Sequence, residues 1–142
     1  MNHALASELR SFQQETSLRI LLAEHNGEVR RLLGLVLHRD GHEVVEVRDA
    51  GELLELLAGA LITPFQPAFD LIICEHTLPG IQGLTILAGL RSRNNDTPFI
   101  LISDDAHVEE RASRLDGVVL NHPLDHGAIR GAIRRSGSRR AC

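Results

Sequence analysis

Lysine, tyrosine and tryptophan are all missing from this chain of 142 residues, and aromatic residues make up only 3% of it. Its 15 basic residues other than histidine are therefore all arginines. Without lysine the chain cannot form a Schiff base or the usual lysine contact of a phosphate-binding loop, and without tyrosine it lacks a phenolic acid or base. Enzyme classes that depend on those groups are excluded.

A surplus of positive charge is also missing. The formal net charge is −4, which argues against a general nucleic-acid-binding protein. The exception is the carboxyl end, where arginine gathers at Arg130, Arg134, Arg135, Arg139 and Arg140. Arginine suits the negative end of a helix, and this is the favoured interpretation; docking to an acidic partner or to nucleic acid is the alternative.

Cysteine and long hydrophobic runs are scarce as well. Cys74 lies inside an apolar run and Cys142 is the last residue, so we expect no internal disulfide. The apolar runs are far shorter than the roughly 20 residues that cross a bilayer, and the first residues lack the pattern of a secretion signal. We expect a cytoplasmic protein without membrane association.

Five apolar strand patterns alternate with five helical patterns. We expect strands at 20–23, 42–47, 71–74, 99–102 and 118–120, with a helix after each, the last over 124–135. This alternation predicts an α/β domain at residues 18–135: a doubly wound, five-stranded parallel sheet with helices on both faces. Residues 1–17 are then an amino-terminal extension and residues 136–142 a loose basic tail.

Helix boundaries are marked by capping residues. Asn26 is a suitable amino-terminal cap, Asp49 and Glu52 have the spacing of a capping box, and either Asp104 or Asp105 precedes a short helical pattern. Gly41 follows the first helical pattern and is typical of a helix end.

Polar side chains follow the strands at the points where the apolar runs stop. The first, third, fourth and fifth strands lead into Glu24 and His25, Glu75 and His76, Ser103 and Asp104, and Asn121 and His122. Ligands of open parallel sheets bind beyond the carboxyl ends of the strands. The sequence therefore predicts a site at that edge, made of carboxylates, imidazoles and a hydroxyl.

Four of these segments, in order, resemble the receiver domain of two-component response regulators over most of residues 18–135. They are Arg19–Asn26, Phe69–Gly80, Thr97–Ser103 and Leu120–Pro123. The resemblance implies a flavodoxin-like fold with strand order 2-1-3-4-5. It also implies a pocket in which an acidic pair and an acceptor aspartate hold Mg²⁺, a lysine pairs with the phosphoryl group and a hydroxyl binds its oxygen.

The matching positions depart from that pattern. Glu75 stands at the acceptor position, His25 at the second acid and His122 at the lysine, while Glu24 and Ser103 keep the first acid and the hydroxyl. Val119 occupies the position of the switch aromatic residue. The segment between Ser103 and His122 is also short, so we expect an abbreviated fourth helix.

These departures predict a pseudo-receiver that is not phosphorylated in the ordinary way. Imidazole is a poor ligand for the hard Mg²⁺ ion. The extra methylene of Glu75 displaces its carboxylate by about 1.5 Å, and in-line phosphoryl transfer is sensitive to errors of that size. Glu75 then either imitates the phosphorylated state permanently or is a neutral replacement; the residues do not separate the two.

The roles of His122 and of the other titratable side chains at this edge have more than one interpretation. His122 either pairs with Glu75 in a pH-sensitive contact or, as we favour, fills space before Pro123. Glu24, His25, Glu75 and His122 together are a less favoured Zn²⁺ or Mn²⁺ site, and we expect neither a metal nor another cofactor. Cys74 is expected to be a core residue.

The expected function is signal transduction by protein binding, without enzyme activity. The resemblance implies a binding face at about Asp105 to Arg135 and a signalling partner: a histidine kinase, an output protein or another regulator. A homodimer through the same face is left open. The alternatives are a receiver that retains phosphoryl transfer at Glu75 or a nearby group, and a metal-binding protein or hydrolase that uses the Glu/His cluster.

Overall fold

The computed structural model describes residues 17–62 and 68–141, and this part of the chain alternates strands with helices. The five parallel strands pair in the order β2-β1-β3-β4-β5, which confirms the predicted fold class and topology. The elements are β1 (Arg19–Ala23), α2 (Gly27–Arg39), β2 (Glu43–Val47), α3 (Ala50–Ile62), β3 (Leu71–Glu75), α4 (Gly83–Ser92), β4 (Phe99–Ile102), α5 (Ala106–Arg114), β5 (Val118–Leu120) and α6 (His126–Ala141).

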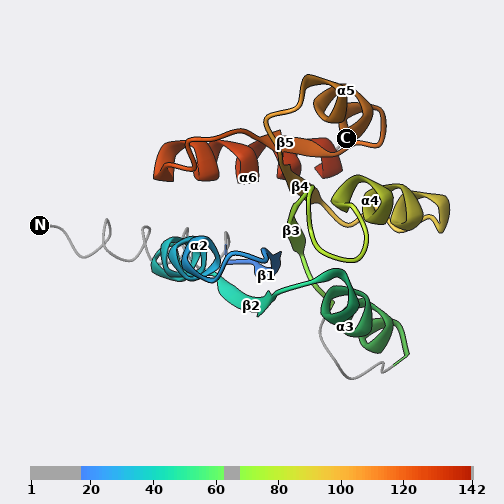
Figure 1. The fold of residues 1–142 in the computed structure, drawn as a ribbon, viewed down its shortest axis with the longest axis horizontal. Coiled ribbons are helices and arrows are strands. Elements are labelled where there is room, and N and C mark those ends of the chain that lie inside the picture. Colours follow the sequence, from blue (N-terminus) through green and yellow to red (C-terminus); the bar gives the residue numbers. More distant parts are fainter. Residues whose placement is uncertain (1–16, 63–67, 142) are drawn as a thin grey trace, which may run out of the picture.

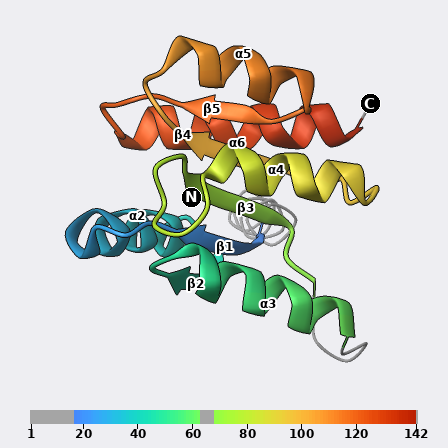
Figure 2. The same ribbon diagram turned by 45° about the vertical axis from the view of Figure 1, so that its right-hand side comes forward.

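Helices cover both faces of the sheet. Figure 1 shows the sheet nearly edge-on, with α2 and α6 on one side and α3, α4 and α5 on the other. Figure 2 shows the same three layers in a turned view, with the carboxyl-terminal helix running behind β4 and β5. Right-handed crossovers place α2 on the opposite face from α3, α4 and α5, because the chain moves along the sheet in one direction from β1 to β2 and in the other from β2 to β5.

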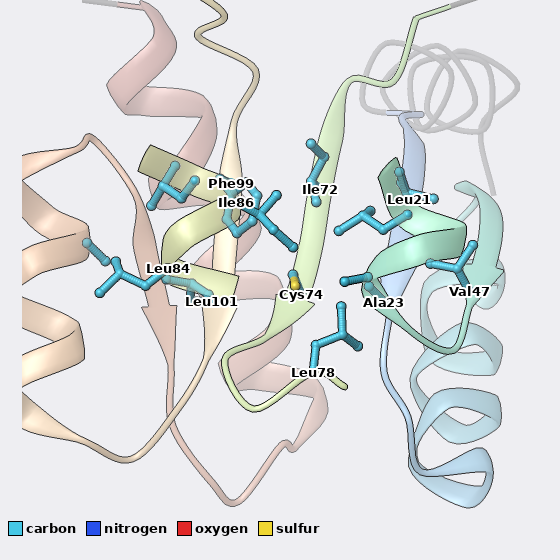
Figure 3. Packing of buried hydrophobic residues seen from close by; sticks show 14 of the residues in the cluster. Leu21, Ala23, Val47, Ile72, Cys74, Leu78, Leu84, Ile86, Phe99 and Leu101 are labelled. Carbon is cyan, nitrogen blue, oxygen red and sulfur yellow. The ribbon is translucent and has the colours of Figure 1, made fainter. Parts of the chain in front are cut away.

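Two hydrophobic clusters hold the layers together. Side chains of a strand alternate between its faces, so Leu21 and Ala23 of β1 join the cluster under α3, α4 and α5, whereas Ile20 and Leu22 join the cluster under α2 and α6. Figure 3 shows the first cluster, with Ile72 and Cys74 of β3 at its centre. All five residues of β3 are buried, as expected of a central parallel strand covered on both faces.

The predicted capping residues make the expected contacts. Asn26 Oδ1 accepts hydrogen bonds from the backbone N–H groups of Glu28 and Val29, and Asp105 Oδ1 accepts one from His107. Asp49 Oδ1 accepts from Glu52 N–H at the start of α3. Gly41 has a φ of +91° just beyond α2, a conformation that glycine adopts without steric cost.

The basic tail differs from the expectation. Helix α6 continues to Ala141, so residues 136–141 are helical and the prediction of a loose tail is wrong. Ser136 is buried, and its hydroxyl donates to the Ile133 carbonyl, so the serine and glycine residues there do not end the helix. The extension at 1–17 lies outside the described residues except for Ser17, as does Cys142. No helix within the described ranges is both long and apolar enough to span a membrane.

Candidate functional site

The carboxyl edge of the sheet gathers the predicted site residues. Glu75 is the last residue of β3, while Glu24 and His25 directly follow β1, its neighbour in the sheet. Ser103 directly follows β4, and His122 comes shortly after β5. The order of the strands therefore divides the edge into two parts, one around β1 and β3 and one around β4 and β5.

Glu75 is bound to His25 on the β1 side. The backbone N–H of His25 donates to Glu75 Oε1 at 2.8 Å, and His25 Nδ1 contacts the same oxygen. Glu75 is only 7% exposed, whereas the side chain of His25 is 52% exposed. The exposed imidazole thus covers a buried carboxylate, and the backbone N–H and Nδ1 of His25 both engage Oε1 of Glu75.

Glu24 lies beside Glu75 and is also buried, at 6% exposure. Burial and the neighbouring Glu75 carboxylate raise the pKa of Glu24 to about 8, and the Arg30 guanidinium offsets this only in part. Two close carboxylates in a low-dielectric setting resist carrying two negative charges, so near neutral pH the pair retains a proton. Arg30 itself donates from Nη1 to the backbone carbonyl of Glu24 at 2.9 Å.

His122 does not pair with Glu75, so that interpretation is wrong. Its Nδ1 lies 2.9 Å from Asp104 Oδ2, and its backbone N–H donates to Asp104 Oδ1 at 2.8 Å. The N–H hydrogen bond and the imidazole lower the pKa of Asp104 below its ordinary value. Because β5 pairs with β4, His122 meets the residues after β4, one strand away from Glu75.

Ser103 and Val119 serve local structure. Ser103 Oγ accepts a hydrogen bond from Asp105 N–H at 3.1 Å, and the Ser103 carbonyl accepts one from Asn121 Nδ2 at 2.7 Å. Val119 is half-buried in β5, and its carbonyl lies 3.5 Å from Arg135 Nη2. Glu75 therefore reaches neither Ser103 nor His122; it contacts His25 and lies beside the Glu24 carboxyl group.

Cys74 is inert in this structure. It is a free, fully buried cysteine, and burial together with the carboxylates of Glu75 and Glu24 raises the pKa of its thiol far above the ordinary value. Its Sγ donates to the Glu75 carbonyl at 3.2 Å. The prediction that Cys74 is a core residue is consistent with this setting.

The ligand atoms of Glu24, His25 and Glu75 lie within 4.8 Å of one another. The receiver resemblance implies Mg²⁺ at this edge, but Mg²⁺ favours carboxylates and water in a near-ideal octahedron. The imidazole of His25 stands where the resemblance places the second acid. These residues therefore do not suit Mg²⁺, and the fourth predicted member of the cluster, His122, lies elsewhere.

Comparison with known proteins identifies the family to which the chain belongs. The family model for the response regulator receiver domain matches residues 20–120, and the chain belongs to this family. It is therefore a receiver domain, the signal-accepting module of two-component signalling. This conclusion agrees with the parallel sheet, its strand order and the position of the polar cluster.

Three curated relatives carry similar segments. The chain is 33% identical over 131 residues to sensor histidine kinase AruS of Pseudomonas aeruginosa, covering 87% of this chain and 12% of that protein. It is 28% identical over 108 residues to transcriptional regulatory protein TcrA of Mycobacterium tuberculosis, covering 76% and 40%. It is 33% identical over 96 residues to Regulator of RpoS of Escherichia coli, covering 68% and 26%. The chain thus spans less than half the length of each of these relatives.

Solved structures share the fold at low sequence identity. The receiver domain of Francisella response regulator 1452 has a TM-score of 0.74 at 18% identity, covering 87% of this chain and 99% of that chain. The chemotaxis response regulator CheY4 of Vibrio cholerae has a TM-score of 0.69 at 20% identity, covering 85% and 99%.

Proposed function

We propose that this receiver is a pseudo-receiver that is not phosphorylated on an acidic side chain in the ordinary way, and that it signals by binding another protein. The observation that carries this proposal is the engagement of Glu75, whose Oε1 accepts the N–H of His25 and contacts its imidazole. Attack on a phosphoryl group requires a carboxylate oxygen that is accessible and aligned in line with the leaving group. Here the residue at that position is buried and covered by His25.

The charge around Glu75 supports the same conclusion. Phosphoryl transfer needs cations close to the transferred group. The chain contains no lysine, and His122, which stands where the family lysine is expected, is bound to Asp104.

The proposed binding face comprises α5, β5 and α6, at about Asp105 to Arg135. A hollow of about 480 Å³ lies on this face between exposed charged side chains of both signs. It is lined by Glu109, Glu110, Ser113, Arg114, Gly117, Val118, Val119, Asn121 and Arg135. A hollow with mixed charges suits a protein partner, because charge complementarity gives specificity. We propose a histidine kinase, an output protein or another regulator as the partner, and a non-enzymatic role.

The phosphorylation part of the proposal is tested with Mg²⁺ and beryllofluoride, which imitates a bound phosphoryl group, by following backbone amide signals in NMR. A non-phosphorylating receiver is expected to show no saturable shifts at Glu75, Ser103 and the residues around His122. Saturable shifts that require both Mg²⁺ and beryllofluoride would contradict the proposal.

The binding face is tested by charge reversal. Arg135→Glu changes an exposed arginine of the proposed face, and Arg31→Glu changes an exposed arginine on α2, outside the hollow and the proposed face. With a histidine kinase of the same organism as the probe, we expect Arg135→Glu to weaken binding and Arg31→Glu to leave it unchanged. Equal effects of both substitutions would argue against this face.

A further inference from the structure

One oxygen of Glu24 is left without a hydrogen-bonding partner. Across the side chains that the structure describes, Glu24 Oε2 is the buried polar atom that lacks one. Glu24 is more than nine-tenths buried, so water does not compensate it freely. An unsatisfied buried oxygen costs about 1–3 kcal/mol, and more when it is charged. Such an atom in a native fold therefore points to a missing partner.

The Glu24 carboxylate belongs to a cluster of three potential ligands. Glu24, His25 and Glu75 each offer one ligand atom, and these atoms lie within 4.8 Å of one another. They come from the ends of two adjacent strands, β1 and β3, which pair in register along their length. The backbone that carries the ligands is thus fixed by the sheet.

The cluster has one side open to solvent. Glu24 and Glu75 are buried, whereas the side chain of His25 is 52% exposed. An ion can therefore enter past the imidazole and meet the two carboxylates behind it. Three protein ligands leave the fourth position of a tetrahedral zinc ion to a water molecule.

The donor set selects the kind of ion. Mg²⁺ prefers oxygen ligands in an octahedron, whereas Zn²⁺ binds a mixture of imidazole nitrogen at about 2.0–2.1 Å and carboxylate oxygen at about 2.0–2.2 Å. Tetrahedral bonds of that length place ligand atoms roughly 3.3 Å apart, so binding requires His25 Nδ1 and Glu75 Oε1, which are in direct contact, to move apart around the ion. Two carboxylates also balance the two charges of the ion, which removes their mutual repulsion.

We propose that Glu24, His25 and Glu75 bind one Zn²⁺ ion at the edge of the sheet, with water as the fourth ligand. The ion supplies the partner that Glu24 Oε2 lacks. The site goes beyond the proposed function, since a receiver can bind Zn²⁺ whether or not it accepts a phosphoryl group. The edge at which the resemblance places Mg²⁺ then holds Zn²⁺, with one coordination position left to water.

The test is calorimetric titration of the chelator-treated chain with Zn²⁺ alone. We expect one Zn²⁺ per chain, an affinity at least tenfold weaker in Glu24→Gln and in His25→Ala, and no competition by excess Mg²⁺. Glu24→Gln keeps the size of the side chain and removes a buried carboxyl group, so it should fold; circular dichroism of each metal-free variant checks this.

Two other histidine and carboxylate pairs serve as matched controls. His122 pairs with Asp104, and His126 lies 2.9 Å from Asp40. His122→Ala and His126→Ala should leave the Zn²⁺ affinity unchanged. Loss of binding in either control, full binding in Glu24→Gln and His25→Ala, or the absence of stoichiometric binding by the unmodified chain would overturn the proposal.

A change of ion preference gives a second readout. His25→Asp replaces the imidazole with a carboxylate and creates an all-oxygen donor set, which suits Mg²⁺. We expect this variant to lose at least tenfold in Zn²⁺ affinity and to gain measurable Mg²⁺ binding. A His25→Asp variant that keeps the original Zn²⁺ affinity would contradict the assignment of His25 as a ligand. Phosphoryl labelling measures the proposed function separately, so the two proposals can fail independently.

Discussion

The backbone N–H and the imidazole of His25 both engage Oε1 of Glu75, so the residue after β1 covers the residue that ends β3. The contact joins two adjacent parallel strands at their carboxyl ends. It engages the carboxylate that the resemblance to the receiver family places at the acceptor position. The stability and the chemistry of this edge should therefore depend on His25.

Removing the imidazole should destabilise the domain. In His25→Ala, Glu75 keeps the backbone hydrogen bond but loses the ring, and a half-exposed contact of this kind is worth about 1 kcal/mol. Urea unfolding of metal-free protein at pH 7 measures the loss. His122→Ala, which removes an exposed pair with Asp104, should leave the unfolding free energy almost unchanged. Equal stability of His25→Ala and the unmodified chain would contradict the structural role of the contact.

Two glycines of α4 should respond in opposite directions to alanine. A Cβ at Gly83 would lie 2.6 Å from Leu101 Cδ2 and 2.8 Å from the Glu75 carbonyl oxygen, whereas nothing lies within 4 Å of a Cβ at Gly89. Gly83→Ala should therefore cost about 1–3 kcal/mol through overpacking. Gly89→Ala should stabilise the chain by up to about 1 kcal/mol through helix propensity. Thermal unfolding of both variants checks the pair, and a neutral Gly83→Ala would argue against the tight approach of α4 to β3.

The stability of the chain should also fall in mild acid because of His42. His42 Nδ1 accepts a hydrogen bond from Leu18 N–H at 3.1 Å, and burial lowers the pKa of this histidine, an effect that Asp40 only partly opposes. The unfolded state then binds a proton more readily than the folded state. The contribution of His42 is fully present above pH about 6.5 and is lost as the pH falls through 6.5 toward the folded pKa.

His42→Asn isolates this effect. The amide oxygen of asparagine can accept the Leu18 hydrogen bond but does not titrate in this range. The unfolding free energy, measured from pH 7 to pH 5, should decline less steeply in the variant than in the unmodified chain. Parallel declines would show that another group causes the acid sensitivity.

The sequence predicted the sheet edge but not the pairs formed there. The strand ends placed Glu24, His25, Glu75, Ser103 and His122 at one edge, because all strands of a parallel sheet point the same way. The expected strand order already placed the fifth strand beside the fourth, but the side chain that His122 meets depends on the local backbone after each strand, which strand spacing along the chain does not fix. The same limit applies to α6, whose continuation past Ser136 depends on packing that local glycine and serine signals do not reveal.

Restoring the family residues should restore phosphoryl transfer if geometry and charge are the only defects. The triple variant Glu75→Asp, His25→Asp and His122→Lys shortens the acceptor, supplies the second acid and adds the missing lysine. We expect Mg²⁺-dependent labelling by acetyl phosphate, measured by intact-protein mass spectrometry. An unlabelled but folded triple variant would show that the shape of the region around α5, which has nine residues, also prevents the reaction.

The most direct measurement of the central claim is the phosphoryl content of the unmodified chain after incubation with radiolabelled acetyl phosphate and Mg²⁺. If Glu75 is a covered structural residue, the protein takes up no label above the level of a Glu75→Gln control. Labelling that approaches one phosphoryl group per chain, is absent from Glu75→Gln and is released at alkaline pH would contradict the account.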